Sequence, residues 1–190
     1  MSIAIPAHDR HRAISTITLA FAADPVVRWL FPDTDRYLAH WPTFAEAYGG
    51  GSITSGAGHT TEDFSAVALW LPPGLSPDEE RMVDVLDAGV GSALRGEVDA
   101  ALEEMDAYHP SNEHYYLTLA GVDPPMQGQG VGSVLLRAGL DRCDEQGLPA
   151  YLEATSARSR NLYARHGFEE LGVIQSGSMP PMWPMLRTPA

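Results

Sequence analysis

The sequence contains no lysine, a single cysteine and no long apolar run. Without lysine the chain cannot form a P-loop, whose Gly-Lys-Ser or Gly-Lys-Thr step needs that side chain to reach a phosphate. One cysteine, Cys143, excludes an intramolecular disulfide, and its helical spacing predicts a small buried hydrophobe rather than a nucleophile. No stretch approaches the length of a membrane span, and no basic-then-apolar leader opens the chain, so we expect a cytoplasmic protein.

Basic residues are also scarce, with 12 arginines against 25 acidic residues and a net charge of −13. The segment from Asp78 to Asp106 is the most acidic part and contains only two arginines, Arg81 and Arg95. This balance argues against nucleic acid and anionic membrane as partners. It is compatible with a cationic substrate, although a solvated helical face explains the charges more simply. The length of 190 residues predicts a single domain, 1–190, with room for a proper core.

The most informative segment that is present is residues 127–132, Gln-Gly-Gln-Gly-Val-Gly. A strand-like run, residues 115–122, precedes it, and a helix-like run follows from Val131. A helix N-terminus leaves N–H groups unpaired and favours an anion, and glycines let the main chain approach a phosphate closely. The segment therefore predicts a pyrophosphate-binding loop. Its glycine spacing does not match the Gly-x-Gly-x-x-Gly of dinucleotide folds, and a simple capping turn would favour Ser, Thr, Asp or Asn.

Taken with its neighbours, this loop resembles a known family. The pattern Gln-x-x-Gly-x-Gly after a strand ending in Val-Asp-Pro is similar to the acetyl-CoA loop of the GNAT superfamily of N-acetyltransferases. Residues 148–154 look like that family's next strand, and residues 158–168 look like its following helix, with Gly167 as the glycine that ends it. The bend at residues 20–25 is similar to the end of the family's first helix. The likeness is closest to the puromycin-acetyltransferase-like branch and most specific over residues 114–168.

The order of elements predicts an α+β fold with a GNAT-like mixed, mostly antiparallel sheet, flanked by helices on both faces and splayed at the cofactor strand. A capping box from Ser76 to Glu79 is expected to open a long helical stretch, and Gly49 to Gly51 to stop a helix. The expected strands are 2–5, 52–59, 64–71, 115–122, 148–154, 169–175 and 182–186. The expected helical segments follow Asp9 and cover 26–30, 37–48, 76–106, the run from Val131, and 158–168.

The resemblance implies that acetyl-CoA is the cofactor. It implies main-chain contacts to acetyl-CoA from Ala120 and Val122, and a contact between Asn161 and the pantetheine, although Asn161 is displaced by two positions from the usual asparagine. Gln127 can donate to a phosphate without adding charge, and Arg137 is a further candidate that a solvated helix position explains as well. The residues implied to hold the pyrophosphate are Gly128, Gln129, Gly130, Val131, Gly132 and Ser133.

Acyl transfer from a thioester to an amine needs a polarised carbonyl, a neutral amine and a proton for the departing thiolate. The resemblance implies that Tyr163 is the acid, while packing between helix and sheet is the alternative. Glu153 matches a glutamate that acts as base in some relatives, and a structural bond to Ser156 or Arg158 is equally plausible. His114 is another candidate base because imidazole titrates in the useful range.

Three residues near the N-terminus are candidates for binding the acceptor: Asp24 for a cation, with Trp29 and Phe31 as an apolar wall. A core position is the alternative for such aromatics. No histidines have metal-ligand spacing, so we predict no metal. The predicted function is acetyl transfer from acetyl-CoA to a small-molecule amine by direct attack on the thioester. The alternatives are a protein or peptide N-terminus as acceptor, or a non-catalytic CoA-binding sensor; a homodimer is left open.

Overall fold

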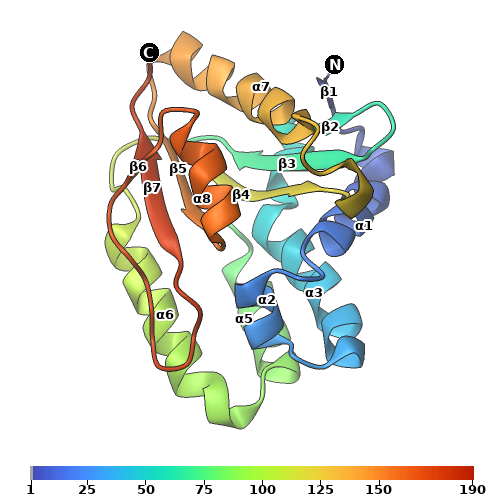
Figure 1. The fold of residues 1–190 in the computed structure, drawn as a ribbon, viewed down its shortest axis with the longest axis vertical. Helices are drawn as coiled ribbons and strands as arrows, with labels where there is room; N and C mark the ends of the chain where they lie inside the picture. Colours follow the sequence, from blue (N-terminus) through green and yellow to red (C-terminus); the bar gives the residue numbers. More distant parts are fainter. Residues whose placement is uncertain (1) are drawn as a thin grey trace.

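The computed structural model describes residues 2–190, whose seven strands form one sheet in the order β1-β2-β3-β4-β5-β7-β6 (Figure 1). Every neighbouring pair is antiparallel except β4 and β5, which run parallel. The strands are β1 Ser2–Ala4, β2 Gly58–Thr61, β3 Ala66–Leu71, β4 Tyr115–Val122, β5 Ala150–Ala154, β6 Glu169–Glu170 and β7 Trp183–Arg187. This confirms the predicted mixed, mostly antiparallel sheet.

Helices cover both faces of the sheet, with α7 on one side and α1, α3 and α5 on the other (Figure 1). Alternate residues of β3 serve the two cores: Val67 and Leu69 pack with α1, α3 and α5, whereas Ala68 and Trp70 pack with α7. The helices are α1 Arg10–Ala20, α2 Pro25–Leu30, α3 Thr34–Gly49, α4 Gly51–Thr54, α5 Glu79–Gly89, α6 Arg95–Tyr108, α7 Val131–Gln146 and α8 Ala157–Ala164. Three short 3-10 turns, 7–9, 92–94 and 124–126, connect them.

The sheet opens between its two parallel strands. β4 and β5 pair only at Tyr115↔Ala150 and Tyr116↔Tyr151, and they separate beyond these positions. On its other edge β4 pairs with β3. There Leu117 and Leu119 pair with two adjacent residues of β3, so Thr118 between them is the extra residue of a β-bulge. A bulge bends the strand that carries it, and this one lies where β4 leaves β5. The predicted splay at the cofactor strand is therefore present and has a local cause.

Two predictions around the first hairpin were wrong. α3 ends at Gly49 as predicted, but the strand expected at 52–59 does not follow directly, because the short helix α4 runs from Gly51 to Thr54 and β2 starts only at Gly58. A Cβ on Gly49 would lie 2.7 Å from Leu69 Cδ1, so this glycine allows α3 to approach the sheet. Phe64, the first residue of the expected strand 64–71, lies before β3 with a φ of 60° and packs into the core on the other side of the sheet from Trp70.

The predicted helical stretch 76–106 consists of two helices. Asp78, not Ser76, caps α5, because its carboxylate accepts a hydrogen bond from the Arg81 N–H. Extended backbone at Val90 ends α5, and α6 begins at Arg95 after a 3-10 turn. The strand expected at 169–175 is reduced to β6 and an isolated bridge at Ile174. In the described range 2–190, none of the helices has the length and apolar character needed to cross a membrane.

Candidate active site

A cavity of about 530 Å³ lies in the opening between β4 and β5. The second half of β4 and the end of β5 line it, and the glycine loop and α8 enclose one end. Residues from α1, α2, α3, α5, α6 and the loop before β7 enclose the other end. The cavity therefore joins the predicted phosphate loop to the N-terminal half of the chain.

The glycine loop has the backbone that an anion site requires. Gly128 and Gly130 have φ angles of 80° and 81°, in the left-handed region that favours glycine. Gly130 is the N-cap of α7 and supplies no side-chain acceptor, so the first N–H groups of the helix are available to a ligand. A Cβ on either glycine would meet no atom within 4 Å, which means that backbone conformation, not crowding, selects glycine here.

Most of the predicted cofactor residues line this cavity. Those that line it are Ala120, Val122, Gln127, Gly128, Gly130, Val131, Gly132 and Ser133. Gln129 and Asn161 do not: the Gln129 amide donates to the Pro125 carbonyl, and Asn161 is exposed on α8. The structure therefore does not group these two residues with the others.

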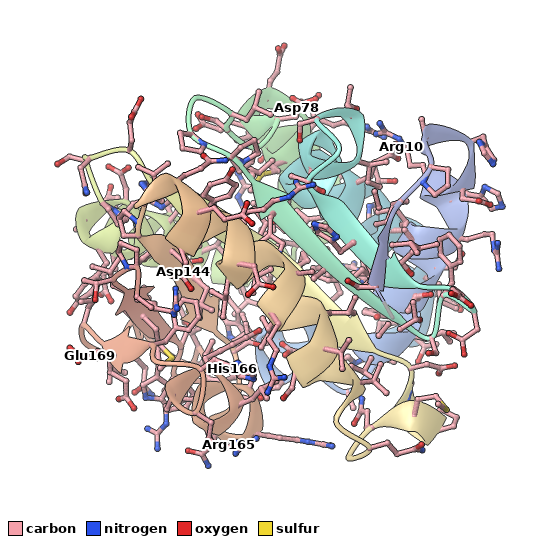
Figure 2. The ribbon with its side chains drawn as sticks, turned by 90° about the horizontal axis from the view of Figure 1, so that it is seen from above. Arg10, Asp78, Asp144, Arg165, His166 and Glu169 are labelled. Atoms are coloured by element: carbon pink, nitrogen blue, oxygen red, sulfur yellow. The ribbon has the colours of Figure 1, made fainter. Side chains whose placement is uncertain are left out.

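Positive charge reaches the loop from α8, which the sequence did not indicate. Arg158 donates to Gln127 Oε1 over 2.7 Å, and the Gln127 amide in turn donates to the Val122 carbonyl over 3.0 Å. Arg165 also lines the cavity, whereas Arg137 is exposed and does not. His166 follows Arg165 in the chain (Figure 2). Its Nε2 lies 3.0 Å from the Ser133 hydroxyl, and this contact joins the end of α8 to the start of α7.

Glu153 lines the cavity just beyond the residues of β5 that pair with β4. Its Oε2 accepts a hydrogen bond from the Tyr116 hydroxyl at 2.7 Å and a longer one from Tyr48 at 3.4 Å. Its Oε1 is buried and has no partner among residues 2–190. Burial raises the pKa of Glu153 to about 7, although the tyrosine hydrogen bonds pull in the opposite direction. The structural alternative, a bond to Ser156 or Arg158, is not what holds this carboxylate.

Tyr163 projects from α8 into the same cavity and packs edge-on against Phe168. Burial raises the pKa of this phenol above its ordinary value, and the nearby Asp24 carboxylate adds to the rise. The side chain is therefore protonated at neutral pH and can act as a donor.

Asp24 lines the cavity, but its oxygens are already engaged. Oδ1 accepts from the N–H groups of Val26 and Val27 at the start of α2, and Oδ2 accepts from the Thr155 hydroxyl after β5. Burial raises the pKa of Asp24, and these three hydrogen bonds oppose the rise. Trp29 lines the cavity as well.

Two predicted site residues lie elsewhere. Phe31 is fully buried and stacks on His40, because the turn that ends α2 directs it into the core. His114 precedes β4 at the closed end of the two strands, where its ring nitrogens contact the Asn112 carbonyl and His109. Neither residue lines the cavity. In residues 2–190 no group of three or more His, Cys, Asp or Glu side chains is placed to hold a metal ion.

A sheet opened between two parallel strands, with a glycine loop at one end of the cavity and a carboxyl group and a phenol in its lining, defines a candidate site for acyl transfer. The chain belongs to the Acetyltransferase (GNAT) family, whose model matches residues 74–168. An uncharacterized N-acetyltransferase of Schizosaccharomyces pombe is 26% identical over 202 residues, covering 97% of this chain and 82% of that protein.

Solved structures agree with this family. The histone acetyltransferase HPA2 and related acetyltransferase from Corynebacterium glutamicum is 27% identical with a TM-score of 0.72, covering 100% of this chain and 96% of that one. The polyamine N-acetyltransferase of Drosophila melanogaster shares the fold at 13% identity, with a TM-score of 0.64 and 99% of each chain covered. The chain is thus an acetyltransferase enzyme.

Proposed function

We propose that this enzyme transfers an acetyl group from acetyl-CoA to the amine of a small molecule by direct attack on the thioester. The observation that carries the proposal is that Glu153, with a pKa of about 7, and the Tyr163 phenol line one cavity together with the glycine loop. The resemblance of residues 114–168 to the puromycin-acetyltransferase-like branch also favours a small acceptor.

The donor end of the cavity fits a phosphate-bearing ligand. When bound, acetyl-CoA supplies the acetyl group as an activated thioester. The free N–H groups at the start of α7 and the positive-φ glycines fit its pyrophosphate. Arg158 and Arg165 add the charge that the loop itself lacks. Backbone N–H groups of β4 beyond Tyr116, where β5 no longer pairs, would polarise the thioester carbonyl.

Glu153 as base and Tyr163 as acid account for each proton transferred in the reaction. Glu153 takes one proton from the ammonium group, which frees the nitrogen lone pair for attack on the carbonyl carbon. As the carbon–nitrogen bond forms and the carbon–sulfur bond breaks, Tyr163 gives its proton to sulfur and recovers one from nitrogen. The net products are an amide, a thiol and the proton held by Glu153, which passes to solvent.

The alternatives differ in what they require of the cavity. A protein or peptide acceptor needs a groove open enough for a main chain, whereas α6 and the loop before β7 enclose this cavity on the acceptor side. A non-catalytic sensor would not need a carboxyl group with a raised pKa and the Tyr163 phenol in the same cavity. The small-molecule amine is therefore preferred. A single domain, a homodimer and a cytoplasmic location stay predictions.

Thiol release from acetyl-CoA with a panel of small amines and short peptides tests this function, with acetyl-CoA binding measured by calorimetry on the same protein. We expect binding and thiol release that depends on a small amine. Binding without release for every acceptor would identify a sensor, and release with peptides alone would move the acceptor to the protein class. Either result would overturn the proposal.

A further inference from the structure

The acceptor end of the cavity is almost entirely apolar. Aromatic, aliphatic and methionine side chains from α1, α2, α3, α5, α6 and the loop before β7 line it, among them Trp29, Trp41, Phe44, Met105, Met179 and Met182. Thioether side chains are flexible and polarisable, and they make favourable contacts with aromatic rings. Such a wall suits an uncharged body of variable shape.

Charge is confined to the other parts of the cavity. Its lining contains four charged residues, Asp24, Glu153, Arg158 and Arg165. Arg158 belongs to α8 and Arg165 directly follows it, so both lie at the donor end, and Asp24 already accepts three hydrogen bonds from the protein. Glu153 is thus the one lining carboxylate with an unpartnered oxygen among residues 2–190. One cation can be neutralised here, and a second would be desolvated without a partner.

A set of solvent-exposed hydrogen bonds connects the elements around the apolar end. Trp29 donates from Nε1 to the Ser178 hydroxyl at 3.0 Å, and that hydroxyl donates to Glu97 Oε2 at 2.8 Å. Glu97 also accepts from the Ser178 N–H at 2.6 Å. These bonds join α2, α6 and the loop before β7, and that loop also carries the lining residues Met179 and Met182. Glu97 does not line the cavity, so the lining offers no carboxylate here for a second cation.

We propose that the acceptor is a primary amine with a single positive charge and an apolar aryl or alkyl body, such as 2-phenylethylamine. Diamines and guanidinium-bearing amines are poor acceptors. This inference rests on the proposed N-acetyltransferase function: the amine lies at Glu153, and its body occupies the wall lined by methionine and tryptophan.

Steady-state thiol release with 2-phenylethylamine and octylamine, against agmatine and spermidine, tests the inference on the full chain. We expect kcat/KM to favour the apolar monoamines by at least about tenfold. Equal or higher values for agmatine or spermidine would overturn it while leaving the acetyltransferase function intact. Thermal shift with each amine separates the two proposals: monoamines that stabilise the protein without any thiol release would support the cavity assignment and reject the small-amine acetylation.

A second experiment tests the inference by introducing a carboxylate into the apolar wall. Leu102 lines the cavity from α6 and is 36% exposed, so Leu102→Glu places a charge in the apolar wall at a position that tolerates it. We expect agmatine kcat/KM to rise about tenfold and that of 2-phenylethylamine to fall. Val83→Glu on α5 is the matched control, because Val83 is 49% exposed and lies outside the lining. The same change in both variants, or none in Leu102→Glu, would overturn the inference.

Discussion

Tyr116 and Glu153 meet across the point where the sheet opens. Tyr116 is the last residue of β4 that pairs with β5, and Glu153 lies two residues beyond its partner Tyr151. The Tyr116 hydroxyl donates to Glu153 Oε2 at 2.7 Å and so spans the apex of the opening. Because one carboxylate oxygen is fixed and the other is unpartnered, the orientation of Glu153 is set before an amine arrives.

The first prediction concerns Glu153 as base. In the wild type kcat/KM should rise with pH through about 7, because the carboxylate must be ionised to accept a proton. Glu153→Gln should lower kcat by about 10²-fold or more and remove that rise, with acetyl-CoA affinity unchanged. Rates at pH 5.5 to 9 with calorimetric affinities at pH 8 check it. A variant that retained the same pH profile would exclude Glu153 as the titrating group.

Tyr116 should act as a positioning residue for Glu153. Its hydrogen bond stabilises the ionised carboxylate and lowers the pKa, so Tyr116→Phe should move the kcat/KM profile to higher pH while the plateau rate is largely kept. A pH–rate profile with 2-phenylethylamine measures the shift. Loss of rate at all pH values with an unmoved midpoint would mean that Tyr116 serves packing alone.

Glu153 should also make stability depend on pH. The pKa in the folded state is about 7 against 4.5 for the ordinary group. Between these values the unfolded chain loses the proton that the folded chain keeps, so stability falls as pH rises, by up to about 3 kcal/mol. Glu153→Gln does not titrate, so its stability relative to the wild type should increase from pH 4 to pH 8. Urea unfolding at both pH values tests this, and a constant difference would contradict it.

Tyr163→Phe tests the acid. Removing the hydroxyl keeps the ring contact with Phe168 but leaves the departing thiolate without a proton donor. We expect kcat to fall by about 10²-fold or more with little change in acetyl-CoA affinity. Single-turnover thiol release measures the chemical step. An unchanged rate would assign Tyr163 to packing between α8 and the sheet.

Gly130→Val tests the loop. A branched side chain is strained at a φ of 81°, so the loop must change conformation, and acetyl-CoA binding by calorimetry should be lost. Gly74→Val is the matched control, because Gly74 has a φ of 82°, has open space around it and lies outside the cavity lining. Both variants should lose stability, and only Gly130→Val should lose affinity. Normal binding by Gly130→Val would reject the pyrophosphate assignment.

Local signals account for what the sequence predicted correctly. The run 115–122 is β4 with unchanged bounds, and α7 begins at Val131 as expected, because alternating apolar residues and clustered glycines act over a few positions. Gly167 has the positive φ expected after α8. The helix α4 within the expected strand 52–59 and the start of α5 were missed because packing against the sheet and a competing cap at Asp78 overrode local preference.

Short-range patterns were enough to predict the glycine loop, its two flanking elements and the family, since these depend on backbone conformation and on residues close together in the chain. Which side chains share the cavity depends on the packing of the whole fold. Tyr48, Tyr116 and Glu153 lie far apart along the chain and meet because α3 packs on the opened sheet. The same folding brings Arg158 to Gln127 and leaves His114 and Phe31 outside. Long-range contacts of this kind depend on how the layers pack, which no local pattern encodes.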